Sequence, residues 1–160
     1  MKKIPLKHAE DYYIKVLLRE LRLKDIMSTP VISIDVNMPF REIPEKYRKF
    51  HIRHLPVTGG PEGKLVGLLS ERDLFRIHSP HRNEEGEWVY DREELNSIIL
   101  RNVMVRNPFY MKEDDCMGEA LVRIVENKFG CIPIVNKDMQ LRGIITQEDI
   151  LRVAAQIYLE

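Results

Sequence analysis

Gly67-Leu68-Leu69-Ser70-Glu71-Arg72-Asp73 decides the fold, because the chain repeats the pattern as Gly143-Ile144-Ile145-Thr146-Gln147-Glu148-Asp149. A glycine, a hydroxyl residue and an aspartate each recur 76 positions later. Upstream, Leu55-Pro56-Val57 recurs as Ile132-Pro133-Ile134, and Met27 recurs as Met104, 77 positions later. A repeat of this length sets the architecture before any other feature does. The sequence therefore predicts two copies of one unit related by a pseudo-twofold axis, with a binding site in the groove between them.

The overall composition is that of a soluble globular protein. Of the 160 residues 44% are hydrophobic, and 25 basic residues balance 25 acidic ones. This neutral balance argues against bulk attraction to nucleic acid or to a membrane surface. No apolar run approaches the roughly 20 residues that span a bilayer, and the polar start Met1–Pro5 lacks a signal-peptide core. Cys116 and Cys131 make no disulfide framework, so the simplest compartment is a reducing cytoplasm.

Hydrophobic periodicity and turn residues predict an α+β fold. An amphipathic helix is expected over 6–24, and the first copy then reads strand, helix, hairpin, helix. Its predicted elements are a strand at 31–34, a helix over 40–51 with Pro44 in its first turn, strands at 55–57 and 64–69, and a helix over 71–78. The second copy follows the same order, with a strand at 108–111, a helix over 116–128, strands at 132–135 and 141–145, and a helix over 147–158.

Residues 79–96 break the pattern and are interpreted as a linker, because most of them are polar or turn-forming. Trp88, the only tryptophan, lies inside this linker. It anchors the linker either against the body of the protein or against a partner chain.

The repeated Ser/Thr-x-x-Asp has two possible roles. The spacing is typical of a strand that runs into a helix start, so the hydroxyl and the carboxylate lie near the first turn, where free N–H groups favour polar ligands. A carboxylate there can accept hydrogen bonds from the paired hydroxyls of a ribose. Alternatively, the two side chains only cap the helix. The sequence leaves both readings open.

In these motifs the chain resembles a tandem pair of cystathionine-β-synthase (CBS) domains, the Bateman module. The resemblance rests on Asp25-Ile26-Met27, on Arg53-His54-Leu55-Pro56-Val57, on the repeated segments above and on their counterparts in the second copy. It implies two βαββα repeats. The predicted division is an N-terminal helix at 1–21, repeat 1 at 22–78, a linker at 79–96 and repeat 2 at 97–160.

The resemblance further implies two nucleotide clefts, each formed by both repeats. Site one would combine Thr29, Ile34, Arg53, His54, Ile144, Thr146 and Asp149. Site two would combine Asn107, Lys112, Gly130, Cys131, Leu68, Ser70 and Asp73.

The two predicted sites differ in charge. Arg53 and His54 can meet phosphate oxygens, so site one is expected to take a phosphorylated ligand. The alternative for this pair is a surface ion pair. Site two keeps only Lys112, and Arg72 nearby, and is expected to be empty or to take an uncharged or cationic adenosyl compound.

These features predict a regulatory, ligand-sensing module rather than an enzyme. The expected ligand is an adenine nucleotide such as AMP, ADP or ATP, or S-adenosylmethionine, with no cofactor required. A homodimer and an unknown effector protein are the expected partners. A structural module with empty clefts and a nucleic-acid-binding protein are the alternatives. No catalytic or metal site is predicted, because His78 and His81 flank Pro80 without a completing ligand set.

Overall fold

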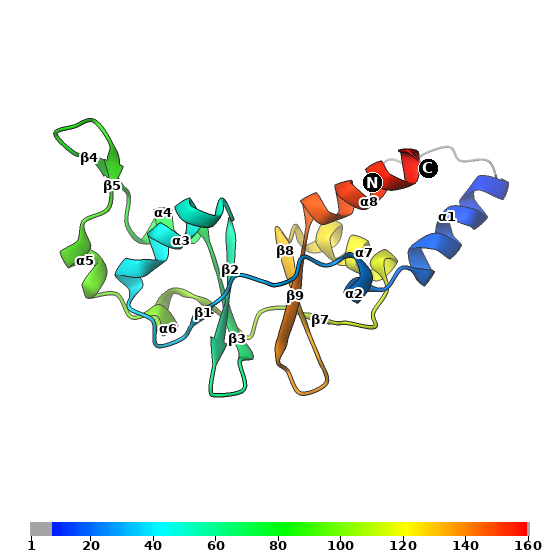
Figure 1. The fold of residues 1–160 in the computed structure, drawn as a ribbon, viewed down its shortest axis with the longest axis horizontal. Coiled ribbons are helices and arrows are strands. Elements are labelled where there is room, and N and C mark those ends of the chain that lie inside the picture. Colours follow the sequence, from blue (N-terminus) through cyan, green and yellow to red (C-terminus); the bar gives the residue numbers. More distant parts are fainter. Residues whose placement is uncertain (1–7, 160) are drawn as a thin grey trace. The chain divides into compact units, whose positions relative to one another are not determined.

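The computed structural model describes residues 8–159, with the side chains described from residue 12 on. The start of the predicted N-terminal helix and the polar segment before it lie outside this range. The chain forms two compact units (Figure 1). Unit 2 consists of residues 31–109 and 138–141, and unit 1 of residues up to Pro30, 110–137 and 142 onward. The units therefore do not follow the order of the chain.

Unit 2 is built on a four-stranded sheet in the order β1-β2-β3-β6, with β1 parallel to β2 and the other neighbours antiparallel. Its elements are β1 (Ile34–Asp35), the 3₁₀ helix η1 (Phe40–Glu42), α3 (Ile43–Phe50), β2 (His54–Gly59), β3 (Lys64–Ser70), α4 (Glu71–Ile77), β4 (His81–Arg82), β5 (Trp88–Val89), α5 (Arg92–Asn96), α6 (Leu100–Val103) and β6 (Val105–Arg106).

Unit 1 repeats the arrangement around a sheet in the order β7-β8-β9. Its elements are α1 (His8–Glu20), α2 (Leu23–Ile26), β7 (Met111–Lys112), α7 (Met117–Asn127), β8 (Cys131–Val135), β9 (Leu141–Thr146) and α8 (Gln147–Leu159). Ser28 adds a further backbone bridge to Ile144 of β9, in the position that β6 holds beside β3. The α+β fold with two βαββα repeats is thus confirmed.

Local predictions differ from the structure in the short segments. The helix expected over 6–24 is broken at Arg22, whose backbone is extended (φ −89°, ψ 148°), because Leu23 N–H donates to the Asp115 carbonyl at 2.9 Å instead of continuing α1. The strand expected at 31–34 is only Ile34–Asp35, and the one at 108–111 is Met111–Lys112. Strand β6 was not predicted. Pro44 lies in the first turn of α3, as predicted.

Residues 79–96 are more than a polar connection. They form the β4–β5 hairpin and α5, whose N-terminus is capped by Asp91. The hydrogen bonds that Glu94 and Glu93 N–H donate lower the pKa of the Asp91 carboxyl. Leu95 anchors the segment in the core with 1% of its surface exposed, whereas Trp88 is 65% exposed and lies under the Arg82 guanidinium. The tryptophan is therefore not the anchor on the body of unit 2.

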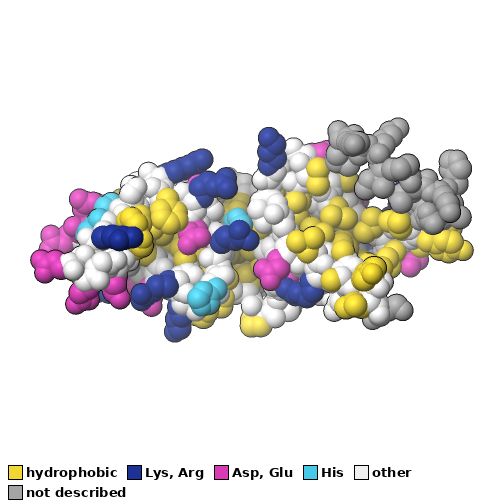
Figure 2. All heavy atoms as spheres, turned by 90° about the horizontal axis from the view of Figure 1, so that it is seen from above, with side chains coloured by type: hydrophobic (Ala, Val, Ile, Leu, Met, Phe, Trp, Pro, Cys, Tyr) yellow, Lys and Arg dark blue, Asp and Glu magenta, His cyan; other side chains and the backbone are white. Residues whose placement is uncertain are grey.

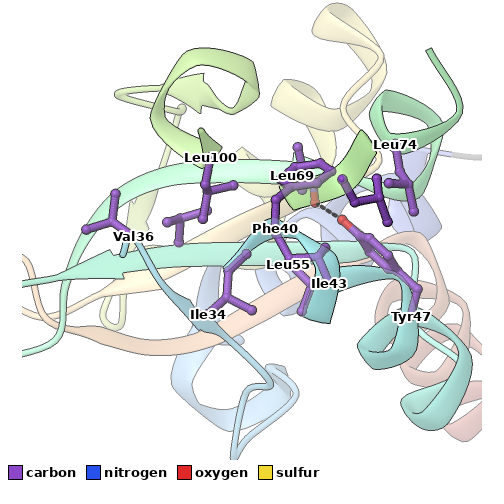
Figure 3. Close-up of a cluster of buried hydrophobic side chains, with 11 residues drawn as sticks. Ile34, Val36, Phe40, Ile43, Tyr47, Leu55, Leu69, Leu74 and Leu100 are labelled. Atoms are coloured by element: carbon purple, nitrogen blue, oxygen red, sulfur yellow. Dashed lines mark hydrogen bonds between the residues drawn. The ribbon is translucent and has the colours of Figure 1, made fainter. Parts of the chain in front are cut away.

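Each unit has its own hydrophobic core. In unit 2, side chains from the sheet, η1, α3 and α4 converge (Figure 3), and the Tyr47 hydroxyl donates to the Leu69 carbonyl at 2.9 Å. This bond satisfies the polar end of a tyrosine that is otherwise buried. The core of unit 1 is formed by Leu23, Met111, Ala120, Ile124, Ile132, Ile134 and Ile145.

In both units the repeated glycine is in close contact with the repeated methionine. Met104, just before β6, packs on Gly67 of β3, and Met27, just before Ser28, packs on Gly143 of β9. A Cβ atom at either glycine would overlap the methionine sulfur. The glycine is therefore required because the first segment of one repeat crosses the last strand of the other repeat at close range.

We predict that Gly67→Ala lowers the free energy of unfolding by about 1–3 kcal/mol, the usual cost of overpacking. Urea denaturation measures this loss. In the background of Met104→Ala, which removes the overlapping sulfur, the same substitution should cost far less. Equal costs in the two backgrounds would show that the methionine is not the reason for the glycine.

Candidate functional site

The two Ser/Thr-x-x-Asp segments form helix starts with the same internal geometry. At α4, Ser70 N–H and Ser70 Oγ donate to Asp73 Oδ2 at 3.0 and 2.5 Å, and Asp73 N–H donates back to Ser70 Oγ. At α8, Thr146 N–H and Oγ1 donate to Asp149 Oδ2 at 2.8 and 2.7 Å. The interpretation of these residues as helix caps therefore accounts for one oxygen, Oδ2, of each carboxylate.

The second carboxylate oxygens differ. Asp149 Oδ1 accepts a hydrogen bond from Ser28 Oγ at 2.7 Å and lies 3.3 Å from Arg152 Nη2, and the Asp149 side chain is fully buried. Among the described side chains, Asp73 Oδ1 has only Arg76 Nη1 nearby, at 4.0 Å, and 27% of the Asp73 side chain is exposed. One carboxylate is therefore closed by protein donors, and the other keeps an open acceptor.

Ser28 causes this asymmetry. The position that matches Ser28 in the repeat is Val105, 77 residues later, which has no hydroxyl and lies in β6 beside β3. Unit 2 therefore has no counterpart of the Ser28 hydrogen bond. Sequence reasoning missed Ser28 because it lies outside the repeated segment. The 77-residue offset, applied one residue beyond Met27, was the available signal.

Arg53 and His54 lie beside the Asp73 helix start. His54 pairs with Ser70 across β2 and β3, and Glu71 N–H donates to the Arg53 carbonyl at 2.9 Å. Arg53 is exposed, and its guanidinium forms no ion pair with the described side chains, those of residues 12–159. Unit 2 by itself thus brings together an open carboxylate oxygen, a hydroxyl, an imidazole and an unpaired guanidinium.

Burial sets the charge state of His54. Desolvation, followed by the neighbouring Arg53, lowers the pKa of the imidazole below its usual value, although Asp73 acts in the opposite direction. His54 is therefore neutral at pH 7, where it can still donate one N–H to a ligand oxygen. Of the neighbouring pair Arg53 and His54, Arg53 therefore supplies the positive charge.

The remaining predicted site residues fall into two groups. Four are wholly or partly withdrawn from solvent: Ile34 is 1% exposed in the core, Ile144 and Cys131 are buried, and Leu68 is half-buried. Burial raises the pKa of the Cys131 thiol to about 12, so this group stays protonated. The exposed group comprises Thr29, Asn107, Lys112 and Gly130.

In three of the exposed residues the backbone or the hydroxyl group has a defined geometry. Thr29 Oγ1 donates to the Arg142 carbonyl at 3.3 Å. Asn107 has a left-handed backbone with φ 47° and directly follows β6. Lys112 N–H donates to Asp115 Oδ2 at 2.7 Å.

Two further observations bound the chemistry. Within the described part of the chain, no group of three or more His, Cys, Asp or Glu side chains has the arrangement of a metal site. Over the same residues, none of the helices has the length and apolar character needed to cross a membrane.

The family model for the CBS domain matches residues 23–79 and 100–156, and the chain belongs to this family. The crystal structure of the CBS domain pair of protein MJ0100, in complex with 5′-methylthioadenosine and S-adenosyl-L-methionine, is 25% identical. It superposes with a TM-score of 0.67, covering 84% of this chain and 96% of that one. CBSX2 in complex with AMP has a TM-score of 0.70 at 22% identity, covers 86% and 98% of the two chains, and shows the fold.

Among curated relatives, the uncharacterized protein MJ1225 of Methanocaldococcus jannaschii is 23% identical over 83% of this chain. The L-aspartate semialdehyde sulfurtransferase of the same organism is 26% identical over 82%. The chain spans 47% of the first relative and 23% of the second. The uncharacterized protein MJ1426 of that organism is 25% identical, with 81% of this chain and 88% of that protein covered.

The lowered pKa of His54 predicts that the free energy of unfolding depends on pH. Because the folded state favours the neutral imidazole, protonation as the pH falls through about 6.5 favours unfolding. The loss of unfolding free energy between about pH 7.5 and pH 5.5 should therefore be smaller in His54→Gln than in the wild type. Urea titrations at the two pH values measure the difference. Arg53→Gln should reduce it partially, and an unchanged difference in His54→Gln would contradict the assignment.

Proposed function

We propose that this chain is a regulatory module that senses an adenosyl ligand, with the Asp73 helix start as its principal half-site. The open oxygen of Asp73 is the observation that carries the proposal, because a ribose diol needs a carboxylate acceptor that is not already saturated. Support also comes from the MJ0100 domain pair, which holds 5′-methylthioadenosine and S-adenosyl-L-methionine.

Each polar group of the half-site has a task. Asp73 Oδ1 accepts from a ribose hydroxyl, while Oδ2 remains bonded to Ser70 and keeps the carboxylate oriented. Arg53 then meets the phosphate of AMP, ADP or ATP as a charge-assisted donor. Arg53 is thus assigned to the half-site of Asp73 rather than to the predicted site one, which contains Asp149. The other residues that the sequence assigned to each cleft from the other unit remain predictions.

The half-site around Asp149 requires an exchange before it binds a diol. Ser28 must give up its 2.7 Å bond to Oδ1, or the ligand hydroxyl must compete with it. A ligand gains less there, because one good hydrogen bond replaces another. This geometry favours the Asp73 half-site over the Asp149 half-site, which the sequence had favoured for a phosphorylated ligand.

Sensing follows from unequal binding to two conformations. A ligand shifts a conformational equilibrium only by its differential affinity for the two states, and coupling of 1–3 kcal/mol is typical. The output is a change in the affinity for an effector protein, because the ligand either favours or opposes the binding of that protein.

Isothermal titration calorimetry with AMP and with S-adenosylmethionine tests the proposal. Asp73→Asn keeps one oxygen for Ser70 and replaces the open acceptor by a donor. We predict a loss of affinity of about 10- to 150-fold, equivalent to a charged hydrogen bond of about 1.5–3 kcal/mol.

The matched control is Asp149→Asn. It should change affinity by less than about threefold and instead lower the free energy of unfolding by about 1–3 kcal/mol, because it disturbs a buried, fully bonded carboxylate. The proposal is wrong if neither ligand binds, and the ranking of the half-sites is wrong if Asp149→Asn causes the larger loss of affinity.

We also propose that the chain forms a homodimer through α8. Leu151 and Tyr158 are 69% and 88% exposed, and Ala154 and Ala155 between them are exposed on the same helical face. Figure 2 shows hydrophobic side chains gathered on the right, where Figure 1 draws α8. An exposed apolar stripe of this kind is typical of an interface between subunits.

Light scattering after size-exclusion chromatography measures this association. We predict that Leu151→Glu shifts the protein from dimer to monomer, because a carboxylate on each copy would be desolvated at the interface. Gln156→Glu adds the same charge to α8 outside the stripe and should leave the mass unchanged. A monomeric wild type would exclude this role for the helix.

A further inference from the structure

Unit 2 contains a cavity of about 740 Å³ beneath the segment 79–96. Its walls come from α3, α4, β5 and α5, so the hairpin and short helix that interrupt the repeats complete it. The volume lies within the range of about 300–1,000 Å³ typical of pockets for small molecules. The cavity lies wholly within one unit of the chain.

The lining is aromatic and apolar. Phe75, Trp88 and Tyr90 contribute rings, and the buried side chains of Leu74 and Leu95 also face the cavity. Phe75 is 48% exposed and Trp88 is 65% exposed, so both rings have free surface for a ligand. Arg82 lies 5.2 Å from the centre of the Trp88 ring but is not part of the lining. These rings favour a planar molecule, which can stack on them.

The cavity is lined by charged groups of both signs. Three guanidinium groups and two carboxylates line it, from Arg41, Arg48, Arg92, Glu45 and Glu71. Arg48 is paired with Glu45 at 2.8 Å, and Arg41 donates to Asn96 at 2.8 Å. Among the described residues, Arg92 has neither a hydrogen-bond acceptor nor an ion-pair partner for its guanidinium. An unpaired guanidinium favours a carboxylate, sulfonate or phosphate.

Tyr90 adds a neutral polar group. Burial, followed by the nearby Glu71 carboxylate, raises the pKa of the Tyr90 phenol above its usual value. Its hydroxyl is therefore protonated at pH 7 and available as a donor.

The cavity is distinct from the adenosyl half-site, although both use α4. Glu71, Leu74 and Phe75 face the cavity and lie on one side of the helix, at i, i+3 and i+4. Asp73 and Arg76 are absent from the lining and form the ion pair described above. Helix α4 therefore presents different side chains to the two places.

We propose that this cavity is a second ligand site, for a planar aromatic molecule that carries an anionic group. The rings of Phe75, Trp88 and Tyr90 contact its apolar body, and Arg92 binds its charged end. In Figure 2 the left part of the surface shows hydrophobic side chains beside both basic and acidic ones. A ligand there would bind the interrupting segment to α3 and α4 of the same unit.

The only tryptophan of the chain lies in this cavity, so its fluorescence reports binding directly. The probe is anilinonaphthalene sulfonate, an aromatic anion, and the matched neutral compound is N-phenylnaphthylamine. We expect the anion to quench Trp88 emission saturably with one molecule bound per cavity, and to bind more tightly than the neutral compound.

Two variants separate the charge from the rings. Arg92→Gln should weaken the binding of the anion by roughly five- to tenfold, a loss between that of an exposed ion pair and that of a buried charged hydrogen bond. The affinity for the neutral compound should not change. Phe75→Ala, at a half-exposed position, should weaken both compounds. Arg72→Gln removes an exposed arginine of α4 that does not line the cavity and should change neither.

Two results would overturn the proposal. The first is an equal response of wild type and Arg92→Gln to the anion, which would show that no charged recognition takes place. The second is Trp88 emission that changes on dilution of the protein alone, which would show that another copy of the chain covers the cavity. Loss of AMP binding has no bearing on either result, because the cavity uses none of the half-site residues.

Discussion

In each unit a methionine packs closely on a glycine, and the way a distant piece of chain extends the sheet depends on this contact. Met104 packs on Gly67 and Met27 packs on Gly143, so the first segment of each repeat lies on the last strand of the other repeat. No larger residue than glycine leaves room for the thioether. Each sheet is completed by a short piece of chain distant in sequence, β6 in unit 2 and the Ser28 bridge in unit 1. Each repeat forms three strands of its own sheet, and the other repeat supplies the piece of chain that extends it.

The same crossing makes the two helix starts chemically unequal. It brings Ser28 onto Asp149, where the hydroxyl closes a buried carboxylate, and it brings Val105 to the matching place in unit 2. A single hydroxyl thus separates a carboxylate that serves mainly the fold from one that keeps an open oxygen. Repeated motifs that look identical in sequence can therefore have different roles, because the third partner comes from outside the motif.

Sequence periodicity predicted the long elements well and the short ones poorly. Helices α7 and α8 and the hairpin strands carry enough apolar residues to define a period, and their predicted bounds lie within a few residues of those observed. Strands β1, β6 and β7 have two residues each, and two residues define no period. Their existence depends on hydrogen bonds to a neighbouring strand. The break after α1 likewise depends on the Asp115 carbonyl, which lies more than 90 residues away.

The sequence by itself determined the family, the doubled βαββα plan and the capped helix starts, because these rest on local propensity and on a repeat that is visible as text. Only the tertiary structure decided which carboxylate oxygen is open, that His54 is buried enough to be neutral, and that the segment 79–96 lines a cavity together with α3 and α4. These properties depend on burial and on donors brought in from distant segments. The solvent exposure of a residue is set by the residues that pack against it, and its place in the chain does not reveal these neighbours.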